Sequence, residues 1–125
     1  MTPAKRGLLF VIALIASGLA PCAAFAHAHL VKASPAVGSQ VSASPKEIRI
    51  SFSEAIEPRF SGIEVKTSSG SAVETGAAGV DPGDKATLVV PLKAALAAGS
   101  YKVTWHVVSV DTHKTQGSFS FEVKP

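Results

Sequence analysis

Hydrophobic and polar residues alternate along most of the chain beyond Pro35. Residues 47–55 (EIRISFSEA) and 100–110 (SYKVTWHVVSV) show the pattern most clearly, and residues 61–69 and 117–124 repeat it. Side chains of a strand point alternately to opposite faces, so this period of two predicts strands with one buried face. The residues that we therefore expect in the core are Ile48, Ile50, Phe52, Ile63, Val65, Tyr101, Val103, Trp105, Val107, Phe119, Phe121 and Val123.

Residues that favour turns separate these runs, and three shorter runs at 29–35, 39–44 and 86–93 complete the set. Pro91 predicts an edge or a strand end, because proline cannot donate a ladder hydrogen bond. Seven short strands in about one hundred residues are typical of an antiparallel β-sandwich or a small Greek-key barrel. Only residues 91–99 (PLKAALAAG) indicate a helical turn, and the Gly/Ala-rich residues 70–86 indicate a long, mobile loop.

The first quarter of the chain has a different composition. Lys5 and Arg6 precede fourteen largely apolar residues, 7–20, and Ala24-Phe25-Ala26 then forms an A-x-A pattern. Basic, apolar and small residues in this order predict a secretory signal peptide, residues 1–26, that is removed from the mature protein. The apolar stretch is short for a membrane-spanning helix, which needs about 20 residues.

Two other interpretations of this segment stay open. The first is an N-terminal anchor that is not cleaved. The second is a lipoprotein cut before Cys22, which Pro21 makes a poor fit.

Cleavage after Ala26 leaves residues 27–125 as one small domain. Removing Lys5 and Arg6 from twelve basic side chains leaves ten against nine acidic ones, a net charge of +1. No Lys/Arg cluster stands out, so we expect neither nucleic-acid binding nor a polybasic membrane patch. The cut also removes Met1 and Cys22, the only sulfur-containing residues, which excludes disulfides, thiolate nucleophiles and cysteine-ligated zinc. We expect a soluble, monomeric protein in the periplasm.

Cleavage changes the chemistry of one histidine. His27 gains a free α-amine, which titrates near about 7.7–8.0 and is therefore accessible in its neutral form. The amine and Nδ1 of one residue can chelate one metal ion, and these nitrogen donors suit Cu(II), which stands highest in the Irving–Williams order. His27 is thus a candidate copper ligand.

A second cluster lies in residues 108–114 (VSVDTHK), where Asp111 and His113 form a D-x-H pair. In an extended backbone positions i and i+2 project from the same face, which brings a carboxylate and an imidazole side by side. Both can bind a metal, or Asp111 can orient His113. The motif alone is a weak signal, and a solvent-exposed turn into the last strand is the alternative.

The other two histidines have less specific surroundings. His29 becomes the third residue of the processed chain, and a free terminus with histidine third can itself chelate Cu(II) through the amine, two deprotonated amides and that imidazole. His29 is equally explained as a polar residue of the first strand. His106 shares its face with Lys102 and Thr104, which favours plain solvent exposure.

Three segments carry a more specific pattern when taken in order. They are residues 27–39 (HAHLVKASPAVGS), 50–65 (ISFSEAIEPRFSGIEV) and 99–123 (GSYKVTWHVVSVDTHKTQGSFSFEV). Together they resemble the CopC/PcoC family of periplasmic copper-resistance proteins, with W-x-V-V-S-x-D-x-H in register in the last segment. The resemblance implies a Greek-key β-barrel or sandwich of the cupredoxin type (Ig-like).

The resemblance also implies a ligand set. Cu(II) is bound by the amine and imidazole of His27 together with Asp111 and His113. Glu54 of the F-S-E segment is placed near the site, although the residue pattern alone explains it as a charge at a strand's end. His29 is expected close by, as an alternative ligand or beside the ligands.

The sequence departs from the family at two places. Some relatives carry a Cu(I) site in a Met-rich loop, whereas the equivalent residues 66–76 (KTSSGSAVETG) contain no methionine and no histidine. Because Cu(I) prefers thioether ligands, we expect no Cu(I) site. His106 stands where relatives often have arginine, and the sequence does not decide between a neutral change and an accessory ligand.

We therefore expect a copper-binding protein rather than an enzyme. It holds one Cu(II) ion for copper resistance and homeostasis, as a carrier or by sequestration, and the resemblance makes a CopD-type inner-membrane protein the expected recipient. Two alternatives remain: a β-sandwich interaction module without a metal, and a copper-dependent oxidative enzyme.

Overall fold

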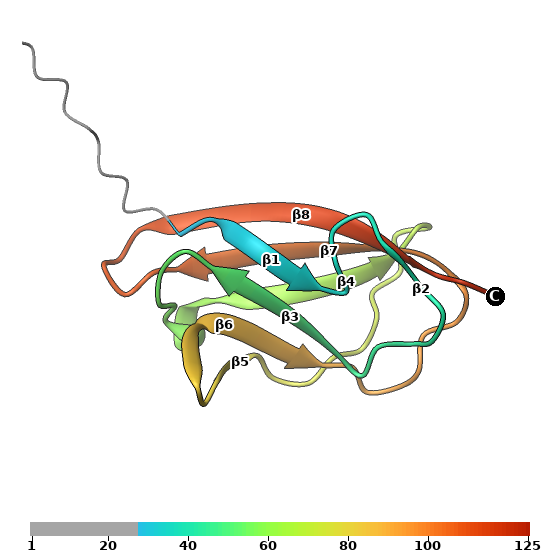
Figure 1. The fold of residues 1–125 in the computed structure, drawn as a ribbon, viewed down its shortest axis with the longest axis horizontal. Coiled ribbons are helices and arrows are strands. Elements are labelled where there is room, and N and C mark those ends of the chain that lie inside the picture. Colours follow the sequence, from blue (N-terminus) through green and yellow to red (C-terminus); the bar gives the residue numbers. More distant parts are fainter. Residues whose placement is uncertain (1–27) are drawn as a thin grey trace, which may run out of the picture.

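The computed structural model describes residues 28–125, so the predicted signal peptide and His27 lie outside the described residues. Two four-stranded sheets pack face to face (Figure 1), with the strand orders β1-β3-β6-β5 and β2-β8-β7-β4. Within the described range no helix is long and apolar enough to cross a membrane. The elements are β1 (Leu30–Ser34), β2 (Gln40–Val41), β3 (Glu47–Phe52), the 3-10 helix η1 (Pro58–Phe60), β4 (Gly62–Thr67), β5 (Gly79–Asp81), β6 (Asp84–Pro91), β7 (Gly99–Val108) and β8 (Lys114–Val123).

The predicted all-β sandwich is confirmed, with two differences in detail. The described residues form eight strands rather than seven, in two separate sheets rather than a closed barrel. β2 contains only two residues and pairs in parallel with β8, Gln40 facing Glu122, whereas the other pairs are antiparallel. A two-residue strand has no periodicity, so its pairing is set by the strand that it meets.

The prediction of one long loop over residues 70–86 was wrong. Residues 79–81 form β5 and pair with β6, Val80 facing Leu88, and the turn between them begins at Asp81. The helical turn expected in 91–99 is also absent from the structure. There the Leu96 amide donates to the Ser44 hydroxyl (2.7 Å), so a side chain from another segment holds this backbone.

The alternating residues meet between the sheets, as predicted. All twelve expected core residues are buried, and Ile56, Leu88 and Val90 join them. Aromatic rings pack closely there: Tyr101 stacks on Phe121 with centroids 5.6 Å apart, and Phe52 meets Trp105 edge-on at 5.0 Å. β6 ends at Pro91, in agreement with the strand end that proline indicated.

The Trp105 indole lies over Gly117, its partner in the β7–β8 ladder. A Cβ at Gly117 would stand 2.5 Å from Cζ2 and 2.9 Å from Cε2 of the indole. We expect Gly117→Ala to lower the free energy of unfolding by about 1–3 kcal/mol, the usual effect of overpacking. Urea denaturation measures this, with Gly79→Ala as control because nothing lies within 4 Å of a Cβ there. If both substitutions lowered the free energy of unfolding equally, a clash between the new Cβ and the Trp105 indole would not be the cause.

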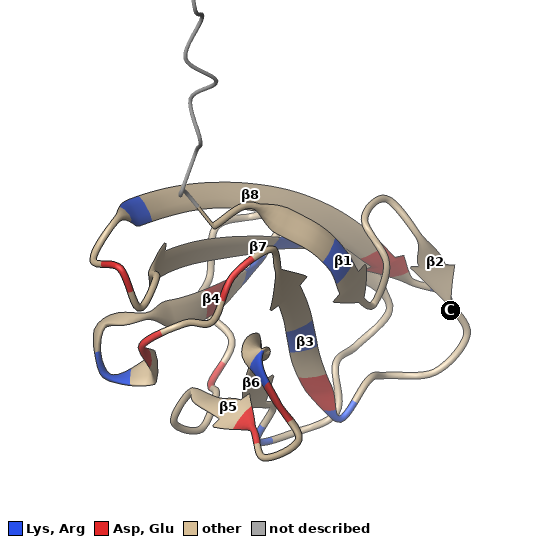
Figure 2. Ribbon diagram, turned by 60° about the vertical axis from the view of Figure 1, so that its left-hand side comes forward, with Lys and Arg blue, Asp and Glu red and all other residues tan. Residues whose placement is uncertain are grey.

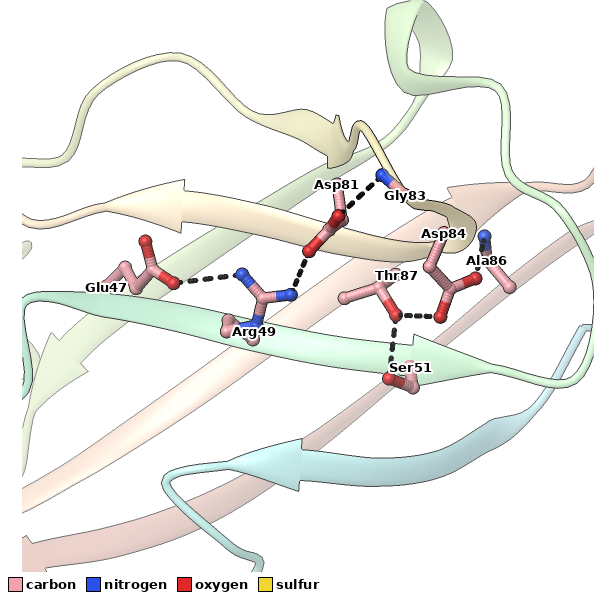
Figure 3. A network of polar contacts seen from close by, with 8 residues as sticks. All are labelled: Glu47, Arg49, Ser51, Asp81, Gly83, Asp84, Ala86 and Thr87. Carbon is pink, nitrogen blue, oxygen red and sulfur yellow. Dashed lines mark hydrogen bonds and ion pairs between the residues drawn. The ribbon is translucent and has the colours of Figure 1, made fainter.

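A polar network on the outer face of the first sheet fixes the β5–β6 turn against β3 (Figure 3). Arg49 bonds to Glu47 (3.1 Å) and to Asp81, and that guanidinium, with the Gly83 amide, lowers the pKa of Asp81 below its usual 3.8. Because the pKa of Asp81 is lowered in the folded state, the network stabilises the fold at pH values above the ordinary pKa of aspartate. This stabilisation is lost as the pH falls through the lowered pKa. The three side chains are 26–42% exposed, so screening by solvent keeps the contribution of each pair to stability small.

Candidate metal centre

The D-x-H pair lies in the turn of residues 109–113, which joins the ends of the ten-residue strands β7 and β8 (Figure 1). Two backbone hydrogen bonds close the turn, from the Ser109 amide to the His113 carbonyl (2.9 Å) and from the Thr112 amide to the Ser109 carbonyl (2.7 Å). Thr112 has a φ of 73°, a left-handed conformation uncommon outside glycine. The predicted proximity is therefore present, but a tight turn produces it and not an extended strand.

Asp111 and His113 face each other across this turn. His113 Nδ1 lies 3.2 Å from Asp111 Oδ2, and the two side chains are 47% and 36% exposed. In the neutral tautomer that donates from Nδ1, the imidazole lone pair is on Nε2, the atom that then binds a metal. The contact thus orients the ring.

The carboxylate of Asp111 has a second partner in Ser109, whose hydroxyl donates to Oδ1. This hydrogen bond is the main reason that the pKa of Asp111 lies below its usual value; His113 adds to the shift and burial opposes it. Asp111 is therefore a carboxylate well below neutral pH. A charged oxygen donor therefore lies beside an imidazole.

Sequence reasoning gave Ser109 no role. The residue is completely buried, and its hydroxyl also lies 3.3 Å from the His113 carbonyl oxygen. A signal was present, since Ser109 continues the core-facing positions Tyr101, Val103, Trp105 and Val107. A hydroxyl at a core-facing position needs a hydrogen-bond partner.

The residue after His27 is held beside the start of β8. Ala28 is only 1% exposed, and its carbonyl accepts a hydrogen bond from Thr115 Oγ1 (2.9 Å). Thr115 stands two residues beyond His113, so the chain enters the described fold next to the D-x-H turn. The bond spans 87 positions of the sequence and joins the segment that leads into β1 to β8 of the other sheet.

Glu54 lies in the segment between β3 and η1, which runs beside the same turn. Its neighbours bond to residues 108–110: the Val110 amide donates to the Ala55 carbonyl (3.0 Å) and the Glu57 amide to the Val108 carbonyl (2.8 Å). Glu54 itself is partly buried. Within residues 28–125, no three His, Cys, Asp or Glu side chains come together as a complete metal site.

His106 is solvent-exposed, as its pattern favoured, and its ring lies over Gly62, its partner in the β4–β7 ladder. A Cβ at Gly62 would lie 2.7 Å from His106 Cε1, so the ring covers that glycine. His106, Phe60, Val108 and Lys114 line a hollow of about 650 Å³, which extends to Thr112 and Thr115. The hollow thus adjoins the D-x-H turn.

A comparison with protein-family models identifies the family of this chain. The CopC domain matches residues 30–124, nearly all of the described chain. The chain belongs to the CopC family. The resemblance found in its three sequence segments is confirmed.

Curated relatives and solved structures agree with the CopC assignment. Protein YobA of Escherichia coli K12 is 40% identical over 99% of this chain and 100% of its own length. Copper resistance protein C of Pseudomonas syringae pv. tomato is 38% identical over 93% of this chain and 92% of its own. Two crystal structures share the fold. CopC from Methylosinus trichosporium OB3b has a TM-score of 0.74 and 35% identity, and the match covers 79% of this chain and 95% of that one. PcoC from E. coli has a TM-score of 0.73 and 33% identity, and the match covers 79% of this chain and 100% of that one.

Several relatives of this CopC-family chain have names that refer to copper. Copper resistance protein C and Copper transport protein CutJ of Bacillus subtilis are proteins of copper resistance and transport, and CopC proteins bind and carry copper and are not enzymes. PcoC is described as methionine-rich. This chain contains one methionine, Met1.

Proposed function

We propose that this CopC-family protein binds one Cu(II) ion in the periplasm, through the amine and imidazole of His27, the carboxylate of Asp111 and the imidazole of His113. The proposal includes removal of residues 1–26 as a signal peptide. The single observation that carries it is the Asp111–His113 contact at the point where Ala28 is tied to β8. The residue before Ala28 supplies the donors that the described residues lack.

The donor set suits Cu(II) and disfavours Cu(I). Amine, imidazole and carboxylate donors favour Cu(II), whereas Cu(I) favours thiolate and thioether ligands. Residues 27–125 contain no sulfur. We therefore propose that copper stays in one oxidation state on this domain.

The proposed role is to carry or sequester copper for resistance and homeostasis, with transfer to a CopD-type inner-membrane protein. CutJ supports a link to transport: 95% of this chain matches 22% of that longer copper transport protein. Val110 in the D-x-H turn and Phe60 in η1 are 53% and 62% exposed and offer apolar contact for a recipient. Charges of both signs are spread over the strands and loops of the described fold (Figure 2).

Intact mass spectrometry of the exported protein tests the proposal in one measurement. The expected mass begins at His27, and one copper equivalent is retained under native conditions. A chain that begins at Met1 or Cys22, or a correctly processed chain that retains no copper, would overturn it.

Ser109→Ala is expected to weaken Cu(II) binding by about 10–100-fold, the usual effect of removing a group that orients a ligand. The substitution removes the hydroxyl that fixes Asp111 and allows the pKa of that carboxyl to rise. Competition with a chelator of known affinity gives the first quantity, and NMR titration of the carboxyl gives the second. Ser118→Ala, on the exposed face of β8, is the control. Unchanged copper affinity in Ser109→Ala would contradict the assignment.

A further inference from the structure

The processed terminus His27-Ala28-His29 offers copper a second way to bind. A terminal amine, the amide nitrogens of the next two residues and a third-residue imidazole can surround Cu(II) in a plane of four nitrogens, a geometry that Cu(II) accepts. This local chelate requires both amides to lose their protons and turn toward the same ion. The fold therefore has to select between the two modes.

The amide of His29 is already engaged. Its N–H donates to Ser53 Oγ (3.0 Å), and the Ser53 N–H donates to the His29 carbonyl (2.9 Å). This pair continues the β1–β3 ladder one position beyond Leu30 and Phe52. A side-chain oxygen takes the place of the carbonyl that a regular ladder would use, so the His29 amide depends on the Ser53 hydroxyl.

Ala28 is held just as firmly from the other sheet. Its side chain belongs to the core, and its carbonyl accepts the hydrogen bond from Thr115 Oγ1 (2.9 Å). Wrapping residues 27–29 around one ion would break this bond and withdraw Ala28 from the core. Successive peptide N–H groups of an extended chain also point in opposite directions, which keeps the two amides from facing one ion.

We infer that Ser53 and Thr115 form a latch that holds residues 28–29 extended and directs copper to the Asp111–His113 pair instead of the local chelate. The latch rests on the proposed function, because it concerns which ligands that copper uses. Ser53 and Thr115 are positioning residues. Neither is a copper ligand.

The test uses the processed chain, residues 27–125, with one equivalent of Cu(II). In the parent the visible and EPR spectra should change on His113→Ala and not on His29→Ala. In the double variant Ser53→Ala/Thr115→Val the copper should move to the four-nitrogen chelate, whose visible absorption is blue-shifted. Adding His113→Ala to this variant should leave that spectrum unchanged, whereas adding His29→Ala should abolish it. Each lost hydrogen bond should shift the balance between the two forms by about tenfold. Thermal unfolding confirms that each variant is folded.

Two controls sharpen the test. Ser118→Ala/Thr104→Val removes the same groups from exposed positions and should leave the parent spectrum unchanged. Ser53→Thr retains the hydroxyl and should restore the parent spectrum. A latch-deficient variant that binds copper as the parent does overturns the latch and leaves the proposed site intact. A parent that already depends on His29 and not on His113 overturns both.

Discussion

Replacing His113 with alanine should weaken Cu(II) binding by more than about a hundredfold, beyond the effect of losing a group that only orients a ligand. The substitution removes the imidazole and also the partner of the Asp111 carboxylate, which lies 3.2 Å from it. The His113 side chain is 47% exposed, so the fold should tolerate the change. Chelator competition measures the affinity, and circular dichroism confirms the fold.

His106→Ala is the matched control for this experiment. His106 is also an exposed histidine on the β7–β8 hairpin, but its ring covers Gly62 rather than contacting Asp111. Its removal should change copper affinity by less than about threefold, within the usual variation of exposed substitutions. Equal losses for the two histidines would show that the D-x-H pair has no special role.

Retaining Ala26 ahead of His27 should weaken Cu(II) binding about as much as His113→Ala does. The extra residue converts the His27 amine into an amide and ends the two-point chelation by a single residue. The affinity is expected to fall by more than about a hundredfold, because the amide nitrogen binds a metal only after losing its proton. Chelator competition on the chains beginning at residues 26 and 27 gives the comparison.

His29→Ala in the chain that begins at His27 separates the two modes of binding. The extension by Ala26 also destroys the local chelate, since His29 is then no longer third. If extension by Ala26 lowers the copper affinity and His29→Ala changes it little, the proposed ligands are supported. Equal affinity of the extended and processed chains would refute a role for the terminal amine.

The long strands could be predicted from the sequence because their periodicity is repeated many times. β7 places Tyr101, Val103, Trp105 and Val107 on one buried face, and four repeats of a two-residue pattern leave little ambiguity. β2 and β5 have two and three residues, too few to show a period. Their pairing is decided by the neighbouring strands, which no local pattern records.

Part of the arrangement around the D-x-H pair could also be predicted from the sequence. The spacing of Asp111 and His113 indicated their proximity, although the left-handed Thr112 that produces it gave no signal. Sequence patterns also could not indicate the Ala28–Thr115 bond, because its partners are 87 positions apart. The role of Ser109 becomes visible only once its side chain is seen to be buried beside Asp111.

The position of β1 at the edge of its sheet has a consequence for how fast copper can exchange. β1, a strand of five residues, pairs only with β3, and the Ala28–Thr115 bond ties the segment before it to β8 of the other sheet. Edge segments of this kind open by local fluctuation while the core stays folded. If His27 supplies half of the donors, detaching this one strand divides the ligand set. Copper can then leave or be passed on at the rate at which β1 opens, with the remainder of the sandwich intact.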